Sequence, residues 1–194
     1  MTSPAATTAT TRNTATMPGT APTTATRYTT LDSPLGELLL VGEESPTAPG
    51  GTALTSLSMP DQRGAATVQP HWRRDPYPFA EAVRQLRAYF AGDRTRFELG
   101  FRTTGTEFQE RVWRALEAIP YGTTTTYGRL AEFLDMPRSD VRALGAAIGA
   151  NPLLILRPCH RVIGADGTMR GYAAGVARKT ALLTHEGALQ PTLI

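Results

Sequence analysis

The sequence predicts an α+β protein with two domains. A small N-terminal domain with an antiparallel sheet and a helix precedes a mainly helical C-terminal domain that contains a winged-helix-like helix-turn-helix. Residues 28–41 and 52–59 have the character of β-strands, whereas apolar residues recur at helical spacing from Phe79 to Phe90. Two short helical segments, residues 127–134 and 140–149, lie close together in the second half. These patterns favour one sheet-based domain and one helical domain.

Composition divides the chain into four segments. Residues 1–26 are almost all Thr, Ala and Pro, with 11 threonines and a single charged residue, Arg12. Such a segment buries too little apolar surface to offset its ordering entropy, so we expect a disordered tail. Residues 27–103 are assigned to the N-terminal domain, 104–188 to the C-terminal domain and 189–194 to a C-terminal tail.

The N-terminal domain should contain several strands and one helix. Gly92 lies where a helix that starts near Phe79 would stop. The predicted elements, in chain order, are two extended stretches flanking a turn at Asp32–Gly36, a strand at Thr52–Met59, a long loop at Pro60–Pro78, the helix, and a strand at Thr95–Leu99.

The C-terminal domain opens with a helix after Gly105. Thr106 and Gln109 have the spacing of a capping box, which marks the start of this helix. The two short helices that follow are separated by a break containing Pro137, and Ser139 is the expected N-cap of the second. Helix pairs of this kind either bind DNA through the second helix or only pack in a core.

A reactive motif follows the helix pair. The apolar run Leu153–Leu156 is predicted to be a strand that leads into Pro158-Cys159-His160-Arg161-Val162, and a final helix is expected at about Val176–Glu186. Cys159 is the only cysteine, so it cannot form an intrachain disulfide. It is therefore either an inert packing residue or a nucleophile, and an adjacent imidazole can favour the reactive thiolate.

Charge and composition limit the possible partners. The formal net charge is +3, and residues 101–194 carry all of it, with 11 basic and 8 acidic side chains. This excess fits a polyanionic partner, but it also fits a simple preference for arginine. No apolar run approaches the ~20 residues needed to span a bilayer and no secretory leader is apparent, so we expect a cytoplasmic protein. One cysteine and three histidines without paired spacing predict no metal site, and no cofactor is expected.

The second half resembles a known family. The residues that carry the resemblance are Gly105-Thr106, Phe108-Gln109, Val112-Trp113, Ile119-Pro120-Tyr121-Gly122, Tyr127, Leu130-Ala131, Arg142-Ala143, Asn151-Pro152, Pro158–Val162, Gly171-Tyr172 and Leu182-Leu183 with Glu186. Across residues 105–187 the chain is similar to the O-6-alkylguanine-DNA alkyltransferases, also called methylated-DNA–protein-cysteine methyltransferases. The N-terminal half looks like their smaller domain, with a less specific pattern.

The resemblance implies DNA repair by direct damage reversal. A methyl or alkyl group would pass irreversibly, in a single turnover, from O-6 of guanine to Cys159, with O-4 of thymine as a further position. The implied partner is double-stranded DNA containing alkylated guanine, contacted from the minor-groove side by a monomer. Cooperative loading on DNA and the preferred adduct stay open.

The resemblance also implies catalytic roles. Cys159 is the acceptor, His160 helps to deprotonate it, Glu186 orients the imidazole, and Tyr127 donates a proton to the flipped base so that a neutral guanine leaves. Adjacent side chains of an extended segment point to opposite sides, so we expect a bridging water between Cys159 and His160. His185 is expected to lie at the surface.

Two further groups of residues complete the implied site. Arg142 would fill the space left by the flipped nucleotide, while the small residues Ala143 and Gly145 allow close approach to the minor groove and Thr126 contacts DNA. The residues expected around the base pocket are Asn151, which should hold a turn through side-chain hydrogen bonds, Tyr172, Val162, and Arg161, which should form an ion pair.

Three positions depart from the pattern of the family. Arg157 replaces an aliphatic residue, Arg170 replaces a small residue, and Ala174 replaces a frequent glycine, so we expect them to affect the size of the pocket.

Two alternative functions remain open. One is a cysteine hydrolase that acts through a thioester, and the other is a non-enzymatic helix-turn-helix DNA-binding protein.

Overall fold

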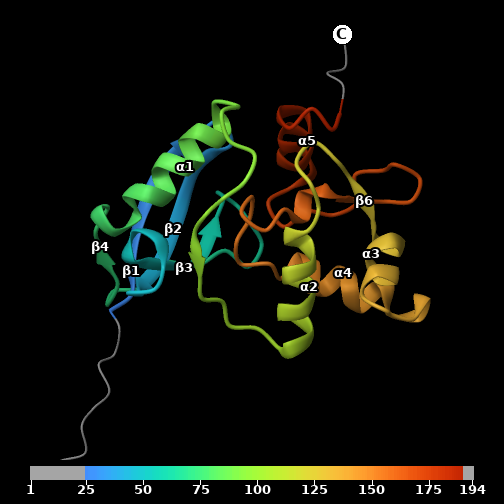
Figure 1. Ribbon diagram of the computed structural model, residues 1–194, viewed down its shortest axis with the longest axis horizontal. Coiled ribbons are helices and arrows are strands. Elements are labelled where there is room, and N and C mark those ends of the chain that lie inside the picture. The colour runs from blue at the N-terminus through green and yellow to red at the C-terminus, as the bar shows by residue number, and fades with distance from the viewer. Residues whose placement is uncertain (1–24, 190–194) are drawn as a thin grey trace, which may run out of the picture.

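A five-stranded sheet forms the N-terminal domain, with the strand order β4-β1-β2-β3-β5. The computed structural model describes residues 25–189, so the tails predicted at 1–26 and 189–194 lie almost wholly outside the described residues. The strands are β1 (Arg27–Ser33), β2 (Gly36–Glu44), β3 (Thr52–Ser58), β4 (Arg73–Arg74) and β5 (Gly100–Phe101). Helix α1 (Ala80–Phe90) covers one face of this sheet (Figure 1).

The sheet is mixed, whereas the sequence predicted an antiparallel one. β1, β2 and β3 are antiparallel to one another, as expected for strands joined by short connections. β4 and β5 pair in parallel with β1 and β3. Each of these edge strands has two residues and follows a long connection, so no hairpin turn sets its direction and no local pattern reveals it.

The strand predicted at Thr95–Leu99 does not form. The Gln85 side chain of α1 bonds both backbone groups of Glu98: it accepts a hydrogen bond from the N–H at 2.8 Å and donates one to the carbonyl at 3.1 Å. These bonds satisfy the groups that a neighbouring strand would use. Pairing with β3 therefore begins only at Gly100. Gly92, with φ at +83°, ends α1 as predicted.

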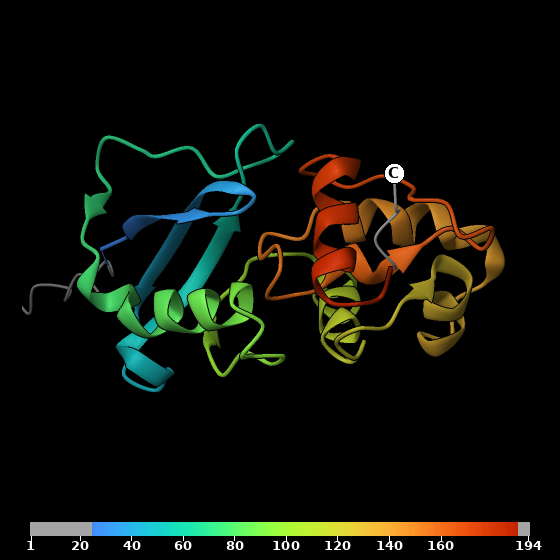
Figure 2. The same cartoon turned by 90° about the horizontal axis from the view of Figure 1, so that it is seen from above.

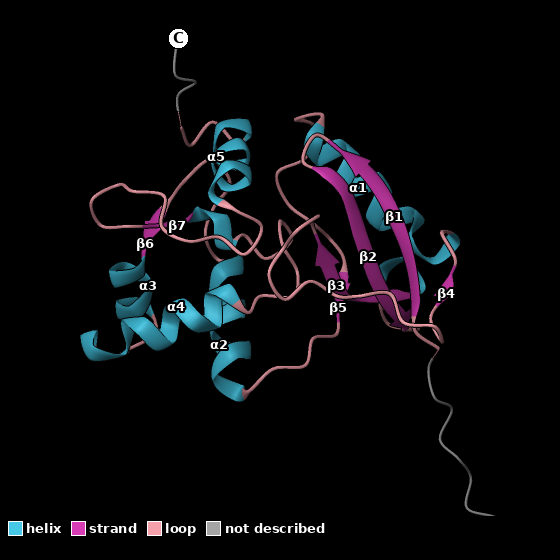
Figure 3. Cartoon of the chain, turned by 180° about the vertical axis from the view of Figure 1, so that it is seen from behind, coloured by secondary structure: helices cyan, strands magenta, loops and turns pink. Residues whose placement is uncertain are grey.

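Four helices and a two-stranded parallel sheet form the C-terminal domain (Figure 3). They are α2 (Glu107–Glu117), α3 (Tyr127–Phe133), α4 (Val141–Gly149), α5 (Val176–His185), β6 (Thr125–Thr126) and β7 (Val162–Ile163). The capping box at Thr106 and Gln109 is confirmed. The Ser139 cap is wrong, because a 3₁₀ turn at 138–140 precedes α4 and the Ser139 hydroxyl bonds Asp140 instead.

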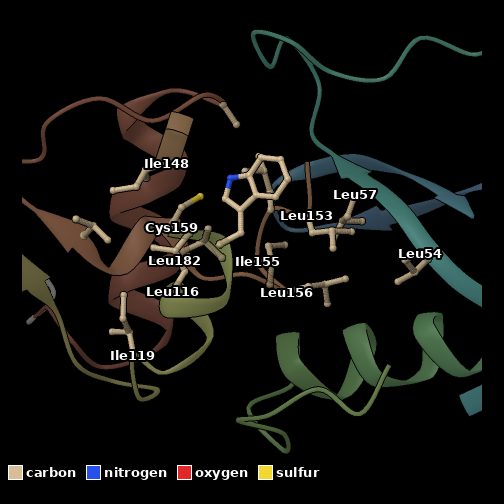
Figure 4. Packing of buried hydrophobic residues seen from close by; sticks show 14 of the residues in the cluster. Leu54, Leu57, Leu116, Ile119, Ile148, Leu153, Ile155, Leu156, Cys159 and Leu182 are labelled. Carbon is tan, nitrogen blue, oxygen red and sulfur yellow. The ribbon is translucent and has the colours of Figure 1, made fainter. Parts of the chain in front are cut away.

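The apolar run 153–156 lies in the C-terminal domain against β3 and forms a series of turns, so the strand predicted there is wrong. Ile155 has φ at +69°, and only Leu153 forms a single bridge with Leu57 of β3. All four side chains are buried, and they belong to the same apolar cluster as residues of the sheet and of the C-terminal helices. Figure 4 shows Leu153, Ile155 and Leu156 beside Leu57 of β3, with Cys159 close by. One apolar core thus continues from the sheet to the cysteine.

Candidate active site

Cys159 begins a short 3₁₀ turn, Cys159–Arg161, where the sequence suggested an extended segment. Its side chain is buried, with only 4% of the residue exposed. Burial raises the pKa of the thiol to about 11, although a hydrogen bond from Asn151 and the charge of Lys179 partly offset this effect. The free thiol is therefore protonated near neutral pH and needs a proton acceptor before it can act as a nucleophile.

Asn151 follows α4, and its side chain bonds the backbone of the segment between α4 and the cysteine turn. Its Oδ1 accepts the Leu153 N–H at 3.0 Å, and its Nδ2 donates to the Arg157 carbonyl at 2.8 Å. The same Nδ2 lies 3.2 Å from the Cys159 Sγ, a contact that the sequence did not predict. A donor at this position stabilises a thiolate more than a thiol, so Asn151 also lowers the cost of ionising Cys159.

His160 and Glu186 form a fully buried pair. The His160 Nε2 lies 2.8 Å from the Glu186 Oε1, and neither side chain is exposed. Burial lowers the pKa of His160 even though the Glu186 carboxylate favours the charged form, so the imidazole is neutral at neutral pH. A neutral imidazole donates one N–H, which here is directed to the carboxylate. Nδ1 therefore keeps its lone pair, and it is buried with no hydrogen-bond partner among the described residues.

Glu186 accepts hydrogen bonds from three residues. Arg161 donates its Nε to Oε2 at 2.7 Å and its Nη2 to Oε1 at 2.9 Å, which identifies the ion pair expected of Arg161. The Tyr89 hydroxyl of α1 donates to Oε1 at 2.8 Å. Burial raises the pKa of Glu186, but the bonds from His160 and Arg161 outweigh it and hold the pKa at about 2. Glu186 is thus a permanent anion behind His160.

Cys159 lies at a small cavity of about 80 Å³. The cavity is lined by Arg63, Tyr127, Gly145, Ile148, Gly149, Cys159, Gly171, Tyr172 and Ala173. Burial and the nearby Cys159 raise the pKa of Tyr127, so its hydroxyl keeps its proton. The Tyr172 hydroxyl is buried and has no partner within residues 25–189. The cavity therefore brings one nucleophile and two protonated phenols together. Val162, by contrast, does not line the cavity; it lies in β7, and its carbonyl accepts a hydrogen bond from Lys179 Nζ at 2.7 Å.

The exposed face of α4 adjoins this cavity. Arg142 and Ala143 are exposed, and Gly145 lines the cavity, where an added Cβ would meet the Tyr127 ring at 3.9 Å. Arg142 forms no side-chain hydrogen bond or ion pair with any described residue, so it is free to reach outward. Thr126 is half-buried, and its hydroxyl caps α3 by accepting the Arg129 N–H at 3.2 Å.

Comparison with known proteins covers both domains. Residues 107–188 match the "6-O-methylguanine DNA methyltransferase, DNA binding domain", and residues 26–103 match the "6-O-methylguanine DNA methyltransferase, ribonuclease-like domain". The chain belongs to the 6-O-methylguanine DNA methyltransferase family. This confirms both the resemblance seen in the sequence and the predicted fold class.

Individual members of the family align over most of their length. The methylated-DNA–protein-cysteine methyltransferase of Mycobacterium tuberculosis is 47% identical over 167 residues, covering 84% of this chain and 94% of its own. The corresponding protein of Methanosarcina acetivorans is 42% identical over 160 residues, covering 82% and 97%. The crystal structure of the M. tuberculosis OGT in complex with DNA superposes with a TM-score of 0.73 at 47% identity, covering 84% and 93%.

None of the three residues that depart from the family pattern lines the cavity. Arg157 points into the domain junction, where it bonds Glu117 at 2.8 Å and Thr103 at 2.9 Å and lies over the rings of Phe101 and Trp113. The Arg170 side chain folds onto Asp166, and Ala174 is buried with its carbonyl bonded by Arg178. These three side chains therefore do not form the wall of the cavity, contrary to the expectation from the sequence.

Sequence reasoning missed two buried polar residues and misplaced one. Tyr89 gave no signal, because it lies 97 residues from Glu186. Lys179 is the only lysine among 20 basic residues, which was a signal. Its buried Nζ donates to the carbonyls of Val162 and Arg170 at 2.7 and 2.8 Å, and burial lowers its pKa to about 8. His185, expected at the surface, instead bonds the Tyr89 carbonyl at 2.8 Å.

Proposed function

We infer that this protein is a methylated-DNA–protein-cysteine methyltransferase that reverses O6-alkylguanine damage in DNA directly. The observation that supports this most strongly is the position of Cys159. Its sulfur lies at a cavity lined by Tyr127 and Tyr172, and the next residue, His160, is paired with the buried Glu186 at the end of α5. A soft nucleophile, a phenolic acid and a proton acceptor are the groups that transfer from an sp³ carbon requires.

His160 takes the proton from Cys159 through a bridging water. Its Nδ1 carries the free lone pair, while Glu186 stabilises the imidazolium that forms. The thiolate then attacks the alkyl carbon, and the electrons of the carbon–oxygen bond pass to the guanine. Tyr127 gives its hydroxyl proton to a ring nitrogen, so a neutral guanine leaves. The product is a thioether that water does not hydrolyse, and each molecule therefore acts once.

The exposed face of α4 contacts DNA from the minor-groove side. The target nucleotide leaves the stack, which costs a few kcal/mol, and Arg142 occupies the space that it vacates. Ala143 and Gly145 allow the helix to come close, and Thr126 contacts the backbone beside α3. The protein acts on double-stranded DNA as a monomer in the cytoplasm, where the reducing environment keeps Cys159 a free thiol. No helix among residues 25–189 combines the length and apolarity needed to cross a membrane.

The test is the intact mass of the protein after incubation with a duplex containing O6-methylguanine. Wild-type protein should gain the mass of one methylene group, since a methyl replaces the thiol proton, and the gain should persist. Cys159→Ala should gain nothing while it still binds DNA. Recovery of the free thiol would favour the thioester hydrolase, and unmodified wild-type protein that still binds DNA would favour the non-enzymatic helix-turn-helix protein.

A further inference from the structure

The loop that follows β3 carries one residue to the mouth of the cavity from the other domain. Arg63 lines the cavity with Cys159, although it belongs to the N-terminal domain. Its backbone N–H donates to the Ala173 carbonyl at 3.0 Å, which joins this loop to the segment before α5. Figure 2 shows the loop extending from the sheet toward that segment. The residue lies within the stretch that the sequence indicated only as a long loop.

The backbone of this loop is fixed independently of the Arg63 side chain. Gln62 is buried, and its Oε1 accepts the Met59 N–H at 3.0 Å. Asp61 and Gly64 on either side have positive φ values of 56° and 76°, which form a tight turn. A substitution that shortens the Arg63 side chain therefore leaves both the turn and the bond to Ala173 in place.

The guanidinium of Arg63 has no partner within residues 25–189. Arg63 is exposed and makes no side-chain hydrogen bond or ion pair with any residue in the described part of the chain. Other arginines near the domain junction are saturated: Arg161 bonds Glu186, and Arg178 bonds the carbonyls of Leu35, Pro60 and Ala174. An unpaired guanidinium offers five donors in a planar fork that matches the oxygens of a phosphate.

When the base of an extruded nucleotide enters this cavity, the phosphates on either side of that nucleotide must lie near the mouth of the cavity. Arg142 lies three residues before the cavity residue Gly145, so it is on the same face of α4. Arg63 places a second unpaired cation at the cavity from the other domain. We propose that Arg63 binds a backbone phosphate next to the extruded nucleotide and thereby holds the damaged base at Cys159. This inference rests on the proposed extrusion of the base into the cavity.

The experiment measures the rate of methyl transfer from two substrates to the wild-type protein and to each of three variants. The substrates are a duplex containing O6-methylguanine and free O6-methylguanine base, which has no phosphate. For Arg63→Ala, the ratio of the second-order rate constants, duplex to free base, should fall roughly 10- to 150-fold, the scale for losing one hydrogen bond to a charged group. The slope of log rate constant against log salt for the duplex should become shallower by about 0.9.

Matched variants separate a specific contact from general charge. Arg63→Lys keeps the charge and should retain most of the duplex rate and the salt slope. Arg73→Ala removes another exposed arginine of the same domain, from β4 on the side away from the C-terminal domain (Figure 1), and should keep the wild-type ratio. Equal losses in Arg63→Ala and Arg73→Ala would overturn the proposal. So would an Arg63→Ala loss that is the same on the free base, since it would indicate a change of cavity shape.

Failure of the proposed function itself would look different. If Cys159→Ala still accepted a methyl group from the duplex, the assigned site would be wrong and the Arg63 inference would fall with it. If Cys159→Ala is inactive but Arg63→Ala keeps the wild-type ratio and salt slope, the Arg63 inference alone is overturned.

Discussion

Replacing Tyr89 by Phe should destabilise the protein through one lost hydrogen bond. The Tyr89 hydroxyl is buried with the whole residue and donates to the Glu186 Oε1 at 2.8 Å. Phe keeps the ring and its contacts, so the change removes only the donor to a buried carboxylate. Hydrogen bonds to charged groups contribute about 1.5–3 kcal/mol, and we expect the free energy of unfolding to fall by this amount.

Urea unfolding and thermal melting measure this loss. For a chain of this size, a loss of that magnitude lowers Tm by about 3–12 °C. Tyr77→Phe is the matched control, because Tyr77 is 87% exposed and the same atom is removed from the surface. We expect that control to stay within about 0.5 kcal/mol of wild type. The rate of methyl transfer should change little in Tyr89→Phe, because the contact between His160 and Glu186 and the bond between His185 and the backbone carbonyl of residue 89 both remain.

A double-mutant cycle with Glu186→Gln tests the assigned partner. If the hydroxyl acts through the charge of Glu186, the two substitutions should be non-additive by about 0.5–3 kcal/mol. Equal destabilisation by Tyr89→Phe and Tyr77→Phe would refute the reasoning. Strict additivity in the cycle would also refute it, since Tyr89 would then stabilise the protein without interacting with the carboxylate.

Three further predictions concern buried polar side chains. Arg157→Met should lower the free energy of unfolding, measured with urea, by about 1–3 kcal/mol, because it removes the hydrogen bonds to Glu117 and Thr103 and two cation–π contacts while keeping an apolar stem. A variant more stable than wild type would contradict this. The pKa of Glu186 is about 2 in the fold against an ordinary 4.5, so the stabilisation that its carboxylate provides is present above pH 4.5 and is lost as the pH falls toward 2. In Glu186→Gln, the free energy of unfolding should therefore depend less steeply on pH over this range. His160 must be neutral to accept a proton and its pKa is lowered, so the transfer rate should persist below pH 6.5, and an acid midpoint at or above 6.5 would contradict the role.

The sequence revealed the helices and long strands because their patterns are local. The capping box at Thr106, the apolar spacing of α1 and the turn between β1 and β2 each involve residues within a few positions of one another. The two-residue strands β4 to β7 have no such pattern, since distant partners alone define them. The run 153–156 was mistaken for a strand because burial on every side gives turns and buried strands the same apolar composition.

The site divides in the same way. Cys159, His160 and Asn151 lie within ten residues of one another, and the sequence pointed to all three as candidate site residues. The partners that tune them come from elsewhere: Lys179 from α5 and Tyr89 from α1. A buried anion draws its donors from whatever elements surround it, and sequence spacing does not record that arrangement.

The buried network also gives the N-terminal domain a part in the chemistry. The motif residues all belong to the C-terminal domain, which by itself accounts for the thiol, the imidazole and the carboxylate. Yet one donor to that carboxylate comes from α1, and the same helix holds His185 through the Tyr89 carbonyl. Glu186 lies at the end of α5, directly after His185, so α1 fixes the helix end that presents the anion to His160. Because the basicity of His160 depends on that anion, the sheet domain helps to set the group that we propose as the proton acceptor of Cys159, although it supplies none of the reacting atoms.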